Sequence, residues 1–307
     1  MSSAIIDMGS NTIRLCVFDF RDGTIETVFS QKKAVGLAGY IRNRELEPDG
    51  ILRVCEALKW FRNLALKFVQ ESDIHVFATA ALREITNRTD ALSAIHSETG
   101  LLPETLSGDE EAYLDFVGFT YGSKLSGGFL IDIGGASTEL VRFSGGLPEK
   151  KISLPVGCLR LYSEYMSGPI ISRQEKKSML RKIRRLFDTF DWSGDRCFTL
   201  IGVGGTVRTA LKLSMILFDA DRSGVSFTAE NVRVLRKMFE NSSPGIFHAL
   251  YKAAPDRALT IYPGLLILEE AVGRLDCAEI CVSRRGVREG FYIDRVLKFH
   301  RDNLDCR

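Results

Sequence analysis

The stretch IIDMGSNTIRL, from Ile5 to Leu15, decides the fold. An apolar run ends in one acid, Asp7, and small hydrogen-bonding residues follow at once. Alone, such a stretch is often no more than a tight turn between strands. The stretch LIDIGGASTEL, from Leu130 to Leu140, repeats it, and two copies predict a chain with an internal duplication. The matching pairs are Asp7 and Asp132, Gly9 and Gly134, Thr12 and Ser137, and Leu15 and Leu140.

The segments around the two copies have the patterns of alternating strands and helices. β-Branched and aromatic residues predict strands at 4–7 and 13–20, and RDGT at 21–24 is typical of a hairpin turn. Apolar residues at helical spacing predict a helix at 51–68, after a break at PDG, 48–50. Further expected elements are a strand, loop and helix at 74–84, a helix at 108–122, a basic helix at 173–190, a strand, glycine turn and helix at 198–211, and a turn and closing helix at 283–299.

Two halves of this kind predict an α/β fold of two domains that face each other across a central cleft, where ligands bind. The chain has 307 residues, 45% of them apolar, which is enough for two cores. The sequence SGG at 126–128 suits a hinge. We therefore expect domains at residues 1–123 and 124–307, with the last helix packing back on the first domain.

Composition narrows the class of protein. A net charge of +2 argues against strong polyanion binding through bulk charge and leaves only local basic patches. The cysteines form no Cys-x-x-Cys pair, and the four histidines do not cluster, so we expect reduced thiols and no zinc site. Neither a signal-peptide pattern nor a membrane-length apolar run is present, so we expect a cytoplasmic protein. The cysteines are Cys16, Cys55, Cys158, Cys197, Cys277, Cys281 and Cys306.

The composition of the repeated turns suits phosphate. Glycine lets backbone N–H groups approach an anion closely, and serine and threonine add hydroxyl donors. An acid at the end of the strand would repel phosphate unless a cation lay between them, and Mg²⁺ is the usual bridge. A third glycine turn, GVGGTV at 202–207, fits neither a Walker A loop nor the G-x-G-x-x-G fingerprint of dinucleotide-binding folds.

Seven motifs in order carry a resemblance to a known family. They are DMGSNTIRL, FATAALREITN, SGDEEA, LIDIGGASTELV, LPVGCLRL, GVGGTVRTAL and SRRGVREG. This set resembles the exopolyphosphatase / guanosine pentaphosphate phosphohydrolase (Ppx/GppA) family over residues 5–290. The resemblance implies two ribonuclease-H-like domains of the actin / sugar kinase / heat-shock ATPase superfold, with the active site between them. It also implies Mg²⁺-dependent release of terminal phosphate from polyphosphate or pppGpp.

The resemblance also implies roles for individual residues. Glu111, the second Glu of the SGDEEA motif, takes the position of the catalytic base. Asp132 and Glu139 lie near the metal, and Asp7 is a further candidate metal ligand. Two departures, Ala136 for a third glycine and Thr12 for a serine, remove no functional side chain. The phosphate-contacting positions are Ser10, Asn11, Arg83, Gly134, Gly135, Ser137, Gly204, Gly205 and Thr206.

Several alternatives stay open at the level of sequence. Glu111 could simply favour a helix N-terminus, and Arg83 and Glu139 could be ordinary surface residues. The basic segment 173–185 could line a groove for a polyanion or form a solvated helix face. An alarmone-binding regulator without turnover, or a kinase of the same superfold, is an alternative function. Nucleic acid is a poor candidate partner, because no nucleic-acid module is recognised, and a homodimer is compatible with the sequence. At this length we expect none of the C-terminal domains of longer members.

Overall fold

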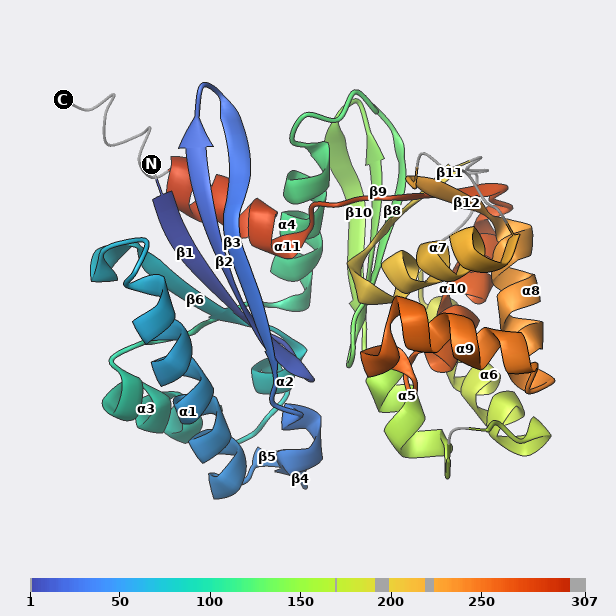
Figure 1. Cartoon of the computed structure of the whole chain (residues 1–307), viewed down its shortest axis with the longest axis horizontal. Helices are drawn as coiled ribbons and strands as arrows, with labels where there is room; N and C mark the ends of the chain where they lie inside the picture. Colours follow the sequence, from blue (N-terminus) through green and yellow to red (C-terminus); the bar gives the residue numbers. More distant parts are fainter. Residues whose placement is uncertain (1, 169, 191–198, 219–223, 299–307) are drawn as a thin grey trace. The chain divides into compact units, whose positions relative to one another are not determined.

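The computed structural model describes residues 2–168, 170–190, 199–218 and 224–298, and Figure 1 traces them. Contacts divide the chain into two compact units, Met1–Glu111 with Arg288–Arg307, and Ala112–Val287. The division falls inside a helix rather than after residue 123, and the sequence-based domain boundary stays a prediction. Cys197, His300 and Cys306, which entered the sequence analysis, lie outside the described residues, and the five described cysteines are free thiols.

The first unit is built on a mixed five-stranded sheet in the order β3-β2-β1-β6-β7. β1, β2 and β3 are antiparallel neighbours, whereas β6 runs parallel to β1 and β7 parallel to β6. The expected hairpin turn is present, with positive φ at Asp22 and Gly23, as a two-residue hairpin of this kind requires. The strands are β1 Ser2–Met8, β2 Thr12–Arg21, β3 Thr24–Ala34, β6 Ile74–Ala78 and β7 Glu104–Thr105, beside a short pair, β4 Ile41–Arg42 and β5 Glu45–Leu46.

Side chains alternate between the two faces of this sheet, and different helices cover each face. Ile6 and Met8 of β1 pack in one core with residues of α1 such as Leu58. On the other face, Phe18 stacks on Tyr292 with ring centroids 5.2 Å apart. α1 begins at Pro48, so PDG opens this helix; the prediction of a break there was wrong, because proline is well suited to a first helical turn. The helices are α1 Pro48–Ala65, α2 Ala80–Arg83, α3 Arg88–Thr99, α11 Val287–Phe291 and the π-helical η4 Tyr292–Leu297, with short 3₁₀ turns η1 Leu37–Tyr40 and η2 Glu71–Asp73.

The second unit repeats this topology in a six-stranded sheet of order β10-β9-β8-β11-β13-β12. β8, β9 and β10 are antiparallel neighbours, and β11 and β13 continue the sheet in parallel, as β6 and β7 do in the first unit. The repeated stretches therefore form β1–β2 and β8–β9, the same hairpin of each sheet. The strands are β8 Gly128–Ile133, β9 Thr138–Ser144, β10 Leu147–Leu154, β11 Thr199–Val203, β12 Ser226–Thr228 and β13 Glu279–Val282.

Two hydrophobic clusters cover the two faces of the second sheet. α4 supplies Ala112 and Phe116 to one cluster with Leu130 of β8. The other cluster joins Ile131 of β8 to the helices that Figure 1 shows grouped beside the sheet. The helices are α4 Gly108–Thr120, α5 Cys158–Tyr165, α6 Arg173–Phe187, α7 Gly204–Phe218, α8 Ala229–Glu240, α9 Pro244–Ala253 and α10 Ile261–Leu275, with the 3₁₀ turn η3 Pro255–Arg257.

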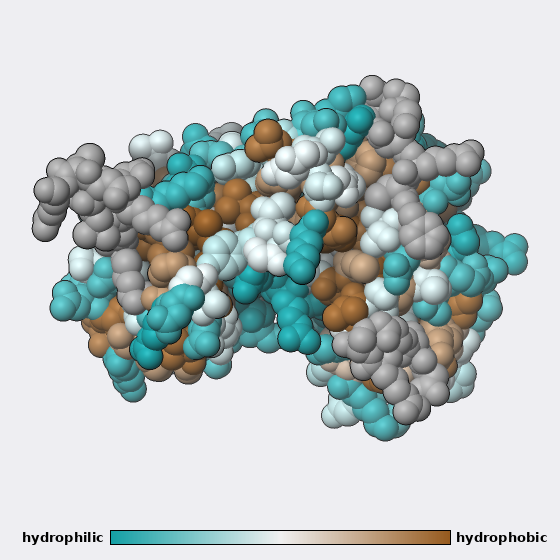
Figure 2. All heavy atoms as spheres, turned by 90° about the horizontal axis from the view of Figure 1, so that it is seen from above, coloured by the Kyte–Doolittle hydropathy of each residue, from teal (hydrophilic) through white to brown (hydrophobic). Residues whose placement is uncertain are grey.

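Figure 2 shows, on the face it draws, hydrophobic residues interspersed with hydrophilic ones. Among the helices in the described part of the chain, none is both long and apolar enough to cross a bilayer.

Candidate active site

The two repeated turns have the same backbone geometry. The amide of Gly9 donates to the carbonyl of Thr12 at 3.1 Å, and the amide of Gly134 donates to the carbonyl of Ser137 at 3.0 Å. A Cβ at either glycine would lie within 3.2 Å of that same carbonyl oxygen, which is tighter than ordinary packing. Glycine therefore suits both copies for the same reason, the narrowness of the turn.

The residue opposite each acid differs between the copies. Strand pairing sets Asp7 opposite Arg14 in the first unit and Asp132 opposite Glu139 in the second. Residues directly opposite each other in an antiparallel pair point to the same face, with Cβ atoms about 5 Å apart. The first hairpin thus presents an acid beside a base, whereas the second presents two carboxylates side by side.

Asp7 is engaged by an arginine from the far end of the chain. Nη1 of Arg288, at the start of α11, donates to Oδ2 of Asp7 at 2.9 Å. Burial raises the pKa of Asp7 above its usual value, and the Arg288 guanidinium opposes that rise. Arg288 lies in the SRRGVREG motif, but sequence reasoning missed it as the partner of Asp7. The sequence did indicate that Asp7 would need a partner, because a carboxylate at the end of a buried strand is unfavourable without one.

Asp132 and Glu139 lie where the second hairpin meets the turn after β11. Glu139 is only 1% exposed, and its Oε1 accepts a hydrogen bond of 2.7 Å from Oγ of Ser153. Gly204 opens α7 with φ of +84°, and a Cβ there would overlap the carboxylate of Asp132. The fold therefore brings the acid of one motif against the glycine turn of another.

The rest of the GGT turn contacts a residue that sequence reasoning missed. A Cβ at Gly205 would overlap the guanidinium of Arg257, so this cation lies directly against the turn. Arg257 follows α9 in the sequence APDRAL and belongs to none of the seven motifs. The hydroxyl of Thr206 is buried and donates to the carbonyl of Ile133 at 3.2 Å, so it also ties α7 to β8. Arg257 is a single arginine in a polar segment, so no sequence pattern distinguished it from other arginines.

The LPVGCLRL motif holds the Gly134–Gly135 turn in place. The amide of Cys158 donates to the carbonyl of Gly134 at 3.0 Å, and the amide of Leu159 donates to that of Gly135 at 2.9 Å. A Cβ at Gly157 would overlap the backbone of Gly135. Glycine at 157 therefore permits direct backbone packing, and the first amides of α5 stabilise the turn. Ser137, the hydroxyl-bearing residue of this turn, is buried.

In the first unit, Arg83 and Glu111 form an ion pair. Nη1 of Arg83, at the end of α2, donates to Oε2 of Glu111 at 2.8 Å, and also to the carbonyl of Leu106 at 3.3 Å. The two side chains are 17% and 13% exposed, so the pair is shielded but reachable. Glu111 does lie in the first turn of α4, as the alternative interpretation holds, but it also forms this ion pair with Arg83.

Ser10 and Asn11 lie on the turn of the first hairpin. Their carbonyls accept hydrogen bonds from the backbone of residues 35–38, at the start of η1, including one of 3.0 Å from the amide of Ala38 to the carbonyl of Ser10. Ser10 is buried, whereas Asn11 is exposed. The turn is thus fixed through its backbone, and the Asn11 side chain faces solvent.

The acids of the second hairpin fit a magnesium ion better than a closed metal cage. Among the described residues, no three histidine, cysteine or acid side chains gather in a metal-binding group. Mg²⁺ keeps several waters and is usually held by one or two carboxylates together with substrate phosphates. The opposed pair Asp132 and Glu139 supplies those two carboxylates beside a glycine turn.

Comparison with known proteins gives consistent matches. The Ppx/GppA family member of Aquifex aeolicus aligns with a TM-score of 0.79 at 24% identity, over 97% of this chain and 98% of that one. An exopolyphosphatase from Cytophaga hutchinsonii aligns with a TM-score of 0.84 at 22% identity, over 97% and 98%. These likenesses confirm the expected α/β superfold.

Sequence relatives give the family. A bifunctional 3-dehydroquinate synthase/phosphatase of Fusobacterium nucleatum is 27% identical over 310 residues, 95% of this chain and 46% of that protein. The chain thus spans about half the length of this curated relative. The family model for the Ppx/GppA phosphatase family matches residues 16–299. With nearly its whole length matched, the chain belongs to the Ppx/GppA phosphatase family.

Proposed function

We propose that the protein is a phosphohydrolase that releases the terminal phosphate of linear phosphoanhydrides, namely polyphosphate, pppGpp or both. Membership of a phosphatase family supports the reaction class. The observation that carries the proposal is the placement of the Asp132 carboxylate against Gly204, beside Glu139 in register. An acid pair that abuts a glycine turn suits a cation and a phosphate together, and suits neither a purely apolar ligand nor a nucleophilic hydrolase.

Asp132 and Glu139 would hold Mg²⁺, directly or through water. The bound ion would neutralise charge on the phosphate oxygens. Like charges directly opposite each other in a hairpin are unfavourable, and a divalent cation would relieve that repulsion. Asp7 we assign to Arg288 rather than to the metal, because the arginine already neutralises its charge at 2.9 Å.

The glycine turns, Arg257 and Arg83 would bind the phosphoryl oxygens. Backbone amides of Gly135 and Gly205 can approach an anion closely, whereas the amide of Gly134 is used within the turn, where it donates to the carbonyl of Ser137. Arg257, which lies against Gly205, would add a charged fork, and arginine suits tetrahedral phosphate through paired N–H donors. Preorganised donors of this kind stabilise charge without reorganisation at the moment of reaction.

Glu111 would act as the general base. It accepts a proton from water as the water oxygen forms a bond to the terminal phosphorus, and the bridging P–O bond breaks with its electron pair going to the shortened chain. Arg83 would hold the carboxylate in place until substrate phosphate competes for its guanidinium.

One observation favours the alternative function, an alarmone-binding regulator with little or no turnover. The Arg83 ion pair engages the carboxylate that the reaction requires. If this pair persisted with ligand bound, Glu111 would be a poor base. The two functions differ in whether phosphate is released.

The test is phosphate release from long-chain polyphosphate and from pppGpp, measured in parallel with Mg²⁺ and with a chelator. Mg²⁺-dependent release from at least one substrate is the expected result. Tight binding of a guanosine alarmone with release from neither substrate would favour the regulator. Transfer of phosphate from ATP to a sugar or acid would favour a kinase instead.

A further inference from the structure

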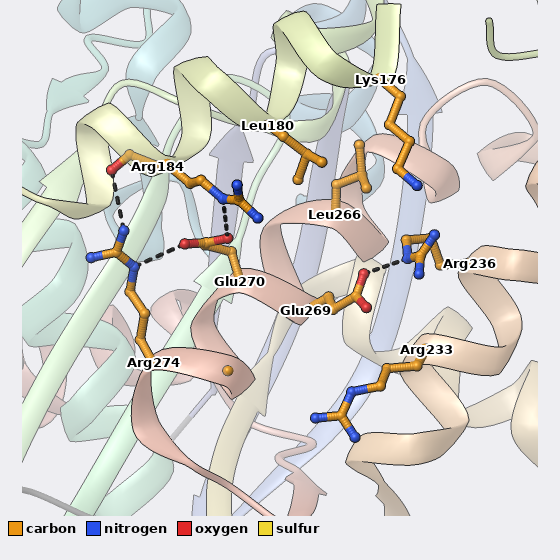
Figure 3. A pocket seen from close by; sticks show the side chains of 10 residues that line it. Lys176, Leu180, Arg184, Arg233, Arg236, Leu266, Glu269, Glu270 and Arg274 are labelled. Atoms are coloured by element: carbon orange, nitrogen blue, oxygen red, sulfur yellow. Dashed lines mark hydrogen bonds and ion pairs between the residues drawn. The ribbon is translucent and has the colours of Figure 1, made fainter. Parts of the chain in front are cut away.

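Helix α6 carries two sets of cations, one paired with acids and one without such partners among the described residues. On the side toward α8 and α10, basic side chains are matched with acids, as Figure 3 shows for Arg184 with Glu270 and for Arg236 with Glu269. Nζ of Lys176 lies 2.8 Å from a carboxylate oxygen of Glu240. These contacts line a pocket of about 600 Å³ and hold three helices together, so this side is structural.

The other set forms a stripe along the exposed side of α6. Its members are Arg173, Lys177, Arg181 and Arg185, which we call the α6 stripe. All four are exposed, and within the described ranges none of them has an acidic side chain within ion-pair distance. Their spacing of four residues places them on one helix face, about 6 Å apart along the axis and about 18 Å from end to end.

The helix that carries this stripe is firmly held. Ser172 and Glu175 form a reciprocal capping box at its start. Met179, Ile183 and Phe187 are fully buried on the opposite side. Four cations that would repel one another are therefore kept in a row by packing that does not involve them. Their side chains border a surface depression of about 640 Å³ together with Lys176, Arg184 and Asp188, and the carboxylate of Asp188 is paired with Arg274.

The chemistry of the stripe indicates the class of ligand. A row of cations without acids attracts a linear polyanion through charge and counterion release. Stacking platforms for bases require aromatic side chains, and α6, described throughout, has only Phe187, which is buried. The row thus offers charge without a stacking platform on α6, which favours a chain of phosphates that carries no bases.

We propose that the α6 stripe is a docking surface for the body of a long polyphosphate chain, separate from the site that takes its terminal phosphate. This inference rests on the proposed function and makes polyphosphate, rather than pppGpp, the substrate that uses the stripe. Three phosphates in a row extend over less than the roughly 18 Å of the stripe, so a nucleotide with three phosphates at one end cannot span it. Chain length should therefore matter for binding.

Equilibrium binding of fluorescently labelled long-chain polyphosphate to the whole protein tests this directly. The stripe variant carries Arg173→Gln, Lys177→Gln, Arg181→Gln and Arg185→Gln. The control variant removes four exposed cations elsewhere, by Lys67→Gln, Arg88→Gln, Lys237→Gln and Lys252→Gln. Both variants lower the net charge by four, so they separate the stripe from bulk charge.

We expect the stripe variant to bind polyphosphate about ten- to a hundredfold more weakly at low salt, with the slope of log affinity against log salt reduced by about 3, as four lost contacts to a flexible polyanion imply. The control variant should bind nearly as the parent does. Phosphate release from tripolyphosphate should be equal in all three proteins. The binding assay does not depend on phosphate release. It would therefore still test the stripe if the proposed hydrolysis were not observed.

Equal loss of affinity in the stripe and control variants would overturn the proposal, since bulk charge would then suffice. So would unchanged affinity in the stripe variant. Single-stranded DNA of the same nominal charge that bound the stripe as tightly as polyphosphate would also overturn it, in favour of a nucleic-acid surface.

Discussion

At the scale of residues, the two hairpins share an acid and a glycine but differ in what faces the acid. Arg14 faces Asp7, and Glu139 faces Asp132. The sequence alignment of the repeats could predict the acids and glycines, because these positions match letter by letter. It could not reveal the partner of Asp7, since Arg288 lies 281 residues away and only the fold brings the two together. The role of Arg257 likewise could not be predicted from the sequence, because it depends on the contact of Arg257 with Gly205 in the folded chain.

Replacement of Glu139 by Gln should weaken Mg²⁺ binding, because the amide keeps the shape of the side chain and its hydrogen bond but removes one of two facing charges. We expect at least a tenfold lower Mg²⁺ affinity in titration calorimetry, with a thermal midpoint close to that of the parent without metal. Glu149→Gln, on the neighbouring strand β10, is the matched control and should leave Mg²⁺ affinity unchanged. Parent-like affinity in Glu139→Gln would remove Glu139 from the metal site.

Replacement of Asp7 by Asn should destabilise the protein by about 3 kcal/mol or less, because it leaves the guanidinium of Arg288, in a side chain only 18% exposed, without its counter-charge. Urea unfolding measures this loss. The double variant Asp7→Asn, Arg288→Met should recover part of it, since both charges of the pair are then removed. A double variant less stable than Asp7→Asn alone would show that the pair is not coupled in this way.

At the scale of elements, the periodicities predicted the strands and helices well, but their ends depended on contacts. Pro48 was interpreted as a break, yet it begins α1. The glycine motif before α5 has a structural role that its letters do not show, because Gly157 matters only where its backbone meets that of Gly135.

Gly157→Ala should therefore impair the second hairpin turn. A methyl group there overlaps the backbone of Gly135, and overpacking of this kind costs about 1–3 kcal/mol. Phosphate release per folded molecule should also fall, since the turn it displaces is the proposed phosphate cradle. Gly245→Ala in α9, where a Cβ meets nothing within 4 Å, is the control and should be neutral or slightly stabilising. Full activity in Gly157→Ala would argue against a role for this turn.

The capping box of α6 gives a pH-dependent contribution to stability. Hydrogen bonds from the side chain and amide of Ser172, and from Ser167, lower the pKa of Glu175 from 4.5 to about 2. Because the folded-state pKa is depressed, the contribution is present above about pH 4.5 and is lost as pH falls toward 2. Urea unfolding at pH 5, 4 and 3 should show a smaller decline in Glu175→Gln than in the parent. Equal declines would contradict the assignment.

At the scale of the whole molecule, the order of seven motifs predicted the family, and the family model spans residues 16–299. The duplication was also readable, because both sheets repeat one topology. What could not be read was the extent of each compact unit, which divides within α4, at Glu111. The spacing of apolar residues in a helix indicates which side of the helix is buried. It does not indicate at which residue the helix passes from one compact unit to the other.

The central claim is hydrolysis of a terminal phosphoanhydride with Glu111 as the base. Its most direct test is the initial rate of phosphate release, with Mg²⁺, from polyphosphate and pppGpp by the parent, Glu111→Gln and Asp109→Asn, the last being an exposed acid of the same helical turn. We predict that Glu111→Gln lowers turnover by about a hundredfold or more, while Asp109→Asn stays close to the parent. Near-parent turnover in Glu111→Gln would contradict the account.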